Sequence, residues 1–194
     1  ERNEPLLLEG IARAAALDPD GARAAFERVL ARSPGDPAAS GGLATLDLQQ
    51  GRPERARSRY LAVLEHRPGQ VATLLELARL ELQLDNAPAA RSALETAVQA
   101  EPAALEPRLR LARLLGQSGQ HAAALATLDA VRARHPDDPQ LLALLGAAQT
   151  ALGDAGGGRA AYRRLLDLDP KSAAGLYGYA SACAAGSDDA GLRA

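Results

Sequence analysis

Residues 71–104 read VATLLELARLELQLDNAPAARSALETAVQAEPAA, a stretch of 34 residues in which Pro102 holds position 32. The same spacing separates a series of prolines along the chain: Pro34, Pro68, Pro102, Pro136 and Pro170. Five matches at one spacing exceed what 12 scattered prolines would give. The period indicates a chain of repeats, each a supersecondary unit that packs on its neighbours.

Side-chain size follows the same period. With each proline at position 32, positions 8 and 20 are always small, position 24 is bulky, and position 27 lies one helical turn further on the same face. In chain order these residues are Gly10, Ala44, Ala78, Ala112, Gly146 and Ala180 at position 8; Ala22, Ala56, Ala90, Ala124 and Gly158 at 20; Phe26, Tyr60, Leu94, Leu128 and Tyr162 at 24; and Val29, Val63, Ala97, Val131 and Leu165 at 27. We expect two helices per unit that touch at the small positions.

This pattern resembles the tetratricopeptide repeat family, whose units carry Leu-Gly or Leu-Ala at positions 7 and 8. The chain supplies Leu43-Ala44, Leu77-Ala78, Leu111-Ala112 and Leu145-Gly146 there. The resemblance implies an all-α fold, a right-handed α-solenoid of helix–turn–helix repeats that forms a single solenoid over residues 1–194. Its repeats would be residues 3–36, 37–70, 71–104, 105–138 and 139–172, with a partial repeat at 173–194.

The chain departs from the family pattern at several positions that normally carry a large apolar residue. Position 4 is Ser40 in one unit and Arg108 in another, and position 7 of the first unit is Glu9. Position 11 is polar in three units: Asp47, Glu81 and Gln149. We expect looser packing at these places.

Turn residues predict where the helices end. Gly51, Gly119 and Gly153 hold position 15, where a first helix would end in the left-handed conformation, and Leu17 and Asp85 hold the equivalent site in the other complete units. The predicted helices are residues 5–16, 19–32, 37–50, 53–66, 71–84, 87–100, 105–118, 121–134, 139–152, 155–168 and about 173–184. Residues 186–194 would begin a second helix that is cut short.

A run of three glycines, Gly156 to Gly158, falls inside a predicted helix. Each costs about 1 kcal/mol relative to alanine. Their place at the helix start favours a frayed first turn and a locally weak unit over a flexible joint. A phosphate-binding loop is disfavoured, because no strand precedes them and no lysine directly follows.

Composition limits the classes of partner. The net charge of −2 and a pI near 6.0 leave no basic surplus for phosphates, so no nucleic acid is expected. Cys183 is the one cysteine, and no apolar run approaches the roughly 20 residues that span a bilayer. The chain starts at Glu1 and contains no methionine, which predicts an internal or processed piece of a longer protein.

No catalytic, cofactor or metal site is predicted. His66, His121 and His135 lie near helix ends, and no two of them share a helix face at metal-ligand spacing. Cys183 has no histidine nearby in the sequence and lies on an alanine-rich helix, which favours a packing role over that of a nucleophile. We therefore expect a protein that is not an enzyme.

The resemblance implies that first helices line a concave groove in which a partner binds. The candidate groove residues are Thr45, Gln49, Leu75, Arg79, Gln83, Leu109, Arg113 and Gln117. Leu75 and Leu109, with Leu82, would form an apolar floor, and the two arginines would grip a carboxylate-bearing peptide or an acidic sugar. The alternative is an ordinary surface on which Glu76 pairs with Arg79 along one helix. The lysine–asparagine–arginine clamp of chaperone-tail-binding members is absent.

The leading hypothesis is a non-catalytic scaffold that binds a protein or peptide, or an acidic polysaccharide. Residues 141–182 are similar to bacterial repeat proteins of exopolysaccharide synthesis and export, which implies a role in that assembly in the periplasm. A second hypothesis is a substrate-presenting arm of a larger enzyme, such as a glycosyltransferase or sulfotransferase. A third is self-association through the C-terminal end, where Leu176, Tyr177 and Tyr179 would be exposed.

Overall fold

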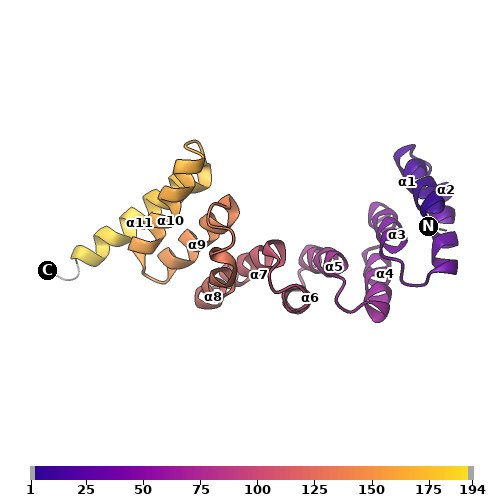
Figure 1. Cartoon of the computed structure of the whole chain (residues 1–194), viewed down its shortest axis with the longest axis horizontal. Helices are drawn as coiled ribbons and strands as arrows, with labels where there is room; N and C mark the ends of the chain where they lie inside the picture. The colour runs from indigo at the N-terminus through magenta and orange to yellow at the C-terminus, as the bar shows by residue number, and fades with distance from the viewer. Residues whose placement is uncertain (1–2, 192–194) are drawn as a thin grey trace. The chain divides into compact units, whose positions relative to one another are not determined.

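The described part of the chain is entirely helical (Figure 1). The computed structural model describes residues 3–191, the last five of them by their backbone alone. Its eleven helices are α1 (Glu4–Ala15), α2 (Pro19–Arg32), α3 (Pro37–Gln49), α4 (Pro53–His66), α5 (Val71–Gln83), α6 (Ala87–Ala100), α7 (Leu105–Gln117), α8 (His121–Arg132), α9 (Pro139–Ala151), α10 (Ala155–Leu168) and α11 (Ala173–Gly191). The predicted all-α fold is confirmed, and the bounds of α1 to α10 lie within two residues of those expected.

The last helix differs from the prediction. α11 continues through Gly186 to Gly191, so no second helix begins at residue 186. Residues 192–194, the rest of that predicted segment, lie outside the described residues. Gly186 packs closely on α10, since a Cβ atom added to it would lie 3.3 Å from the Cβ of Ala155. A single glycine costs a helix only about 1 kcal/mol, so its packing decides the outcome.

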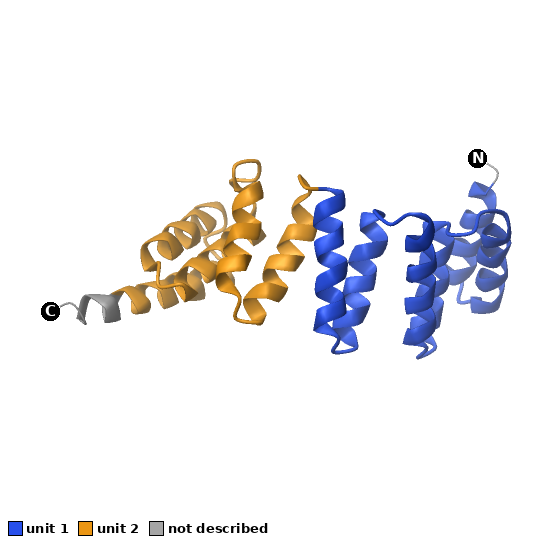
Figure 2. Cartoon of the chain, turned by 90° about the horizontal axis from the view of Figure 1, so that it is seen from below, with its two compact units in different colours: residues 1–101 blue, residues 102–194 orange. Residues whose placement is uncertain are grey.

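The chain divides into two compact units (Figure 2). Unit 1 is residues 1–101 and contains α1 to α6, and unit 2 is residues 102–194 and contains α7 to α11. Inside each unit the two helices of a repeat pack together, and the second helix of one repeat also packs on the first helix of the next. Those internal joints are α2 with α3 and α4 with α5 in unit 1, and α8 with α9 and α10 with α11 in unit 2.

Local chemistry sets the helix ends. The carboxylates of Asp36 and Asp138 accept hydrogen bonds from the backbone N–H groups of Ala39 (3.0 Å) and Leu141 (2.8 Å), each just before a proline that opens the helix. All five residues at position 15 have positive φ: Leu17 (59°), Gly51 (67°), Asp85 (56°), Gly119 (74°) and Gly153 (84°). The predicted left-handed turn is therefore confirmed, including in the two repeats that have no glycine at position 15.

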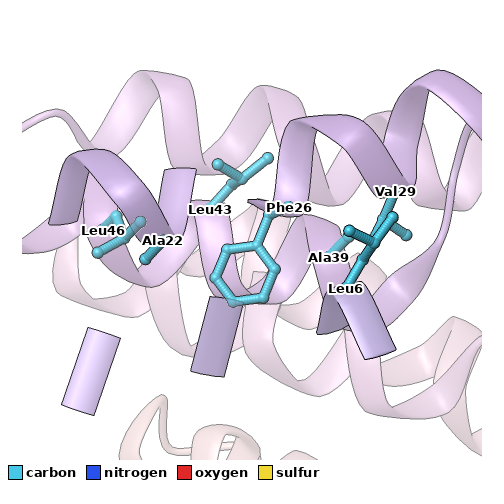
Figure 3. Close-up of a cluster of buried hydrophobic side chains, with 7 residues drawn as sticks. All are labelled: Leu6, Ala22, Phe26, Val29, Ala39, Leu43 and Leu46. Carbon is cyan, nitrogen blue, oxygen red and sulfur yellow. The ribbon is translucent and has the colours of Figure 1, made fainter. Parts of the chain in front are cut away.

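Small residues let the helices of unit 1 close around one aromatic ring. Phe26 is almost fully buried, and a Cβ atom added to either Gly10 or Gly42 would lie 2.6 Å from its ring. Figure 3 shows this ring among the buried side chains contributed by α1, α2 and α3. The small positions 8 and 20 and the bulky position 24 thus form the core as predicted, except that Ala180, at position 8 of the last repeat, is exposed.

Unit 2 repeats the arrangement around Tyr162. This buried ring packs against Gly146 of its own repeat and Gly178 of α11, and an added Cβ atom at Gly146 would lie 2.8 Å from it. Within the glycine run, Gly158 has the packing role that its position 20 predicted. A Cβ atom at Gly158 would lie 3.2 Å from the Gly146 carbonyl oxygen, so the absent side chain lets α10 approach α9. The helix starts regularly at Ala155, with Asp154 as its cap, and not in a frayed turn.

Candidate functional site

In unit 1, the candidate groove residues lie on α3 and α5. Thr45, Gln49, Arg79 and Gln83 are exposed, and Leu75 is half-buried. The Arg79 guanidinium donates two hydrogen bonds to one carboxylate oxygen of Glu76, at 3.0 and 2.8 Å, and a longer one of 3.4 Å to Gln83. The Glu76–Arg79 ion pair that helical spacing predicted is therefore present. A neighbouring carboxylate already balances its charge.

In unit 2, Arg113 and Gln117 line a hollow of about 260 Å³ between α7 and α9. Leu144, Ala147 and Ala148 of α9 and Ala112, Gly116, His121 and Ala124 of α7 and α8 complete its lining. An Nη atom of Arg113 donates to the side-chain oxygen of Gln140, at 3.2 Å. The hollow exists because its lining residues are mostly small, and an exposed cation stands at its edge.

The predicted apolar floor is not found as expected. Leu109, at position 5 of its repeat, is only 3% exposed and belongs to the core, because its side chain turns inward from α7. Leu82, by contrast, is 41% exposed. Arg79 belongs to unit 1 and Arg113 to unit 2, so a joint grip by the two arginines stays a prediction.

The described residues hold no cluster that could bind a metal ion. Between residues 3 and 191, no three metal-ligating side chains come together. The imidazole Nδ1 of His66 lies 3.1 Å from the Ala62 carbonyl oxygen, one turn earlier on α4. In the same part of the chain, no helix combines the length and the apolar character that crossing a bilayer requires.

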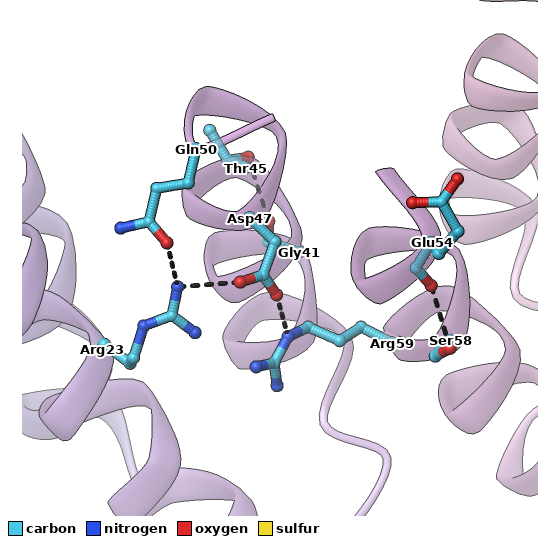
Figure 4. Close-up of polar contacts among 8 residues, drawn as sticks. All are labelled: Arg23, Gly41, Thr45, Asp47, Gln50, Glu54, Ser58 and Arg59. Atoms are coloured by element: carbon cyan, nitrogen blue, oxygen red, sulfur yellow. Dashed lines mark hydrogen bonds and ion pairs between the residues drawn. The ribbon is translucent and has the colours of Figure 1, made fainter. Parts of the chain in front are cut away.

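Two of the three departures at position 11, Asp47 and Glu81, form buried ionic clusters, and the expected looser packing is wrong at these two. Asp47 is fully buried, and its carboxylate accepts hydrogen bonds from Arg23 of α2 (2.8 Å) and Arg59 of α4 (2.6 Å), as Figure 4 shows. Burial alone would raise the pKa of Asp47. The hydrogen bonds from Arg59 and Arg23 outweigh it and hold the pKa below its ordinary value.

Glu81, at position 11 of the next repeat, forms the same kind of buried ionic cluster. Arg57 binds its two carboxylate oxygens through Nε (2.5 Å) and Nη2 (2.8 Å), and the side-chain amide of Asn86 donates a further hydrogen bond of 2.8 Å. Among the described residues, no buried side-chain nitrogen or oxygen lacks a hydrogen-bond partner. The signal in the sequence was an arginine 24 residues before each acid, at position 21 of the preceding repeat.

A family comparison explains why these features recur with one period. The profile described as Tetratricopeptide repeat matches residues 13–77, 48–100 and 81–148. The chain belongs to the tetratricopeptide repeat family. A search of curated proteins found no match.

Solved structures share the fold of this tetratricopeptide repeat protein at low sequence identity. A tetratricopeptide repeat protein from Parabacteroides merdae is 17% identical, with a TM-score of 0.76, over 97% of this chain and 75% of its own. MamA is 18% identical, with a TM-score of 0.70, over 87% and 92%. YrrB, described as a TPR protein with an unusual peptide-binding site, is 16% identical, with a TM-score of 0.70, over 89% of each chain. The fold is generally a non-catalytic scaffold for protein interactions.

Proposed function

We propose that the chain is a non-catalytic scaffold that binds a protein or peptide segment on its first helices, with the hollow beside Arg113 as the principal contact. The observation that carries this proposal is a cation at the edge of an apolar recess of about 260 Å³. Such a recess suits a small apolar side chain. The neighbouring guanidinium suits a carboxylate of the same segment.

Charge balance favours Arg113 over Arg79 as the anchor. Arg113 donates its hydrogen bond to a neutral amide, that of Gln140. A carboxylate of the ligand would replace this amide as acceptor and form a stronger, charge-assisted hydrogen bond. Arg79 would first have to leave Glu76, to which it is already paired. Gln117 adds an amide at the edge of the hollow, where it can donate to or accept from a peptide backbone. In unit 1, Thr45, Gln49, Leu75 and Gln83 would extend the contact without supplying most of its free energy.

The test is a binding titration with a peptide library and with acidic polysaccharides. Wild type is compared with Arg113→Glu and with Arg79→Glu as the matched charge-reversal control. We expect Arg113→Glu to weaken peptide binding at least about tenfold, the loss of one charge-assisted hydrogen bond, and Arg79→Glu to weaken it less. Equal losses in the two variants, or peptide binding that neither variant changes, would reject Arg113 as the anchor.

Two narrower roles rest on sequence resemblance, and each has its own test. Binding of acidic polysaccharide that Arg113→Glu abolishes would support a role in bacterial exopolysaccharide assembly or export. A substrate-presenting arm of a larger enzyme would be supported by a glycosyltransferase or sulfotransferase domain in the same polypeptide.

Self-association is a separate proposal. Leu176 and Tyr177 of α11 are 53% and 80% exposed, and they would pair with a second copy. Tyr179 is less available, since Arg163 stacks on its ring and donates to its hydroxyl. Light scattering over a concentration series tests this proposal, and a strict monomer would remove it.

A further inference from the structure

Unit 1 carries two further hollows on the side of its second helices, at equivalent places one repeat apart. The first, of about 430 Å³, lies between α2 and α4, and the second, of about 580 Å³, lies between α4 and α6. Most of their lining residues correspond at a spacing of 34: Leu30 with Leu64, Pro34 with Pro68, Arg55 with Ala89, Ser58 with Ser92, and Arg59 with Ala93. The two hollows therefore differ in chemistry and not in place.

The first hollow is cationic and has no carboxylate among its lining residues. Arg55 is exposed, and within residues 3–191 its guanidinium makes no hydrogen bond or ion pair. Arg59 also lines the hollow, and its Nε donates to Asp47, which fixes the guanidinium in place; no other hydrogen bond from this guanidinium is drawn in Figure 4. His66 closes one end, with its ring packed against Gly35.

The second hollow is apolar and balanced in charge. Its one arginine, Arg57, is held by both carboxylate oxygens of Glu81, and alanines stand in place of Arg55 and Arg59. Leu61 is 46% exposed at its edge, beside Leu64 and Leu74. A ligand that needs a counter-charge would therefore choose the first hollow, whereas a purely apolar ligand would fit either.

We infer that the hollow between α2 and α4 is a second docking site, which binds an acidic peptide segment with alternating apolar and carboxylate side chains. An apolar side chain would lie against Leu30, Pro34 and Ala62, and the next carboxylate would accept hydrogen bonds from Arg55 and the Nη groups of Arg59. Charge complementarity argues for this occupant, because two arginines and no acid are among the lining residues, and the one carboxylate that Arg59 contacts, Asp47, is shared with Arg23. The site is on other helices than the Arg113 hollow and does not depend on it.

The probe is a hexapeptide of alternating leucine and glutamate, titrated into the ¹⁵N-labelled full chain, with a leucine–glutamine peptide as the uncharged control. Backbone amide shifts report each hollow separately. We expect the glutamate peptide to move the amides of Ala62, His66 and Gly35. We expect the glutamine peptide to bind there at least about tenfold more weakly.

Substitutions test which arginine supplies the positive charge that binds the peptide. Arg55→Ala should raise the Kd measured at those amides about tenfold, the loss of one charge-assisted hydrogen bond. Arg52→Ala, which removes an exposed arginine outside the hollow, should leave that Kd within about twofold, as should Arg113→Ala. Circular dichroism should show an unchanged Tm for Arg55→Ala, because the residue is exposed and unpaired.

Three results would overturn the inference: no shift at these amides, equal Kd values for the glutamate and glutamine peptides, or equal Kd values for Arg55→Ala and wild type. Shifts confined to the amides around Arg113 would support the principal site and reject this second one. Amide shifts confined to residues 30–66 would support this second site and reject the principal one. The two proposals thus fail independently.

Discussion

Position 11 of the repeat is Asp47 in unit 1 and Gln149 in unit 2, and the two residues have different surroundings. Asp47 is fully buried between arginines of α2 and α4, while Gln149 is half-buried. At the same position of α7, Leu115 is a core residue with 3% exposure. An ion pair of unit 2, Arg164 with Asp137, lies at the surface with both side chains about half exposed (51% and 50%). One repeat length thus accommodates two ways of joining neighbouring repeats.

A buried ion pair makes the joint between two repeats depend on both of its partners. Desolvation offsets much of the Coulomb attraction, so the clusters at Asp47 and Glu81 need not make unit 1 more stable than unit 2. They do make unit 1 sensitive to the loss of a single partner, because a buried acid would lose an arginine, or a partly buried arginine would lose its carboxylate. They also fix which arginine of one repeat meets which acid of the next.

The largest effect is expected from removing the buried carboxylate. Asp47→Ala removes the carboxylate that Arg23 and Arg59 share, which leaves Arg23 only the side-chain oxygen of Gln50, and should lower the free energy of unfolding by about 3 kcal/mol. Gln149→Ala, the matched change in unit 2, should cost under about 1 kcal/mol, because no buried charge depends on it. Urea denaturation measures both changes. Equal losses would break the distinction between the units.

The next effect concerns acid. The pKa of Asp47 is lower in the folded chain than its ordinary value, so its contribution to stability is fully present above the unfolded pKa of about 3.9. That contribution is lost as the pH falls through the folded pKa, below about 3.9. The Tm gap between wild type and Asp47→Asn should therefore be largest near neutral pH and shrink below about pH 3.9. Scanning calorimetry across this range checks the sign, and a gap that widens in acid would contradict it.

A smaller effect tests the glycines around the aromatic rings. Gly42→Ala would push a Cβ atom to 2.6 Å from Phe26 and should cost about 1–3 kcal/mol by overpacking. Gly41→Ala, one residue earlier in α3, meets nothing within 4 Å and should stabilise the chain by up to about 1 kcal/mol through helix propensity. Opposite signs for neighbouring substitutions are the expected result in chemical denaturation. A stabilising Gly42→Ala would show that the ring can move aside.

The smallest effect concerns the turn at Leu17. This residue has φ of 59° and is 89% exposed, so it is strained in the left-handed region and contributes little packing. Leu17→Gly should raise the free energy of unfolding by about 1 kcal/mol, to match the glycine turns at Gly119 and Gly153. Thermal melts in parallel with Asp85→Gly measure this gain. A loss of stability would mean that the Leu17 side chain makes a contact that its exposure does not reveal.

Much of the fold followed from the sequence because the repeat constrains residue size at fixed positions. Ala22, Ala56 and Ala90 had to be small wherever two helices meet, and the structure buries all three completely. The ionic clusters did not follow, because a pattern of single positions treats an acid at a core position as a defect. The acid at a core position is explained only when Glu81 is paired with Arg57, 24 residues earlier in the sequence.

The candidate site was harder to predict than the fold. The Glu76–Arg79 pair followed from helical spacing, since residues three apart share one helix face. The hollow beside Arg113 did not, because it depends on Ala147 and Gly116, small residues of two helices that the sequence does not bring together. The burial of Leu109 was not predicted, for a related reason. Side chains at the same repeat position point toward solvent in one repeat and into the core in another.

The most direct test of the comparison between the units is a double-mutant cycle on Arg57 and Glu81, measured by urea denaturation of Arg57→Ala, Glu81→Leu and the double variant. Each single change removes one partner of the pair, whereas the double change places a leucine without an arginine partner at position 11, the residue type that Leu115 supplies at this position of α7. We expect the double variant to lose less stability than the sum of the single changes, by about 1–3 kcal/mol. Additive losses would contradict the account, because they would mean that the ion pair does not join these repeats.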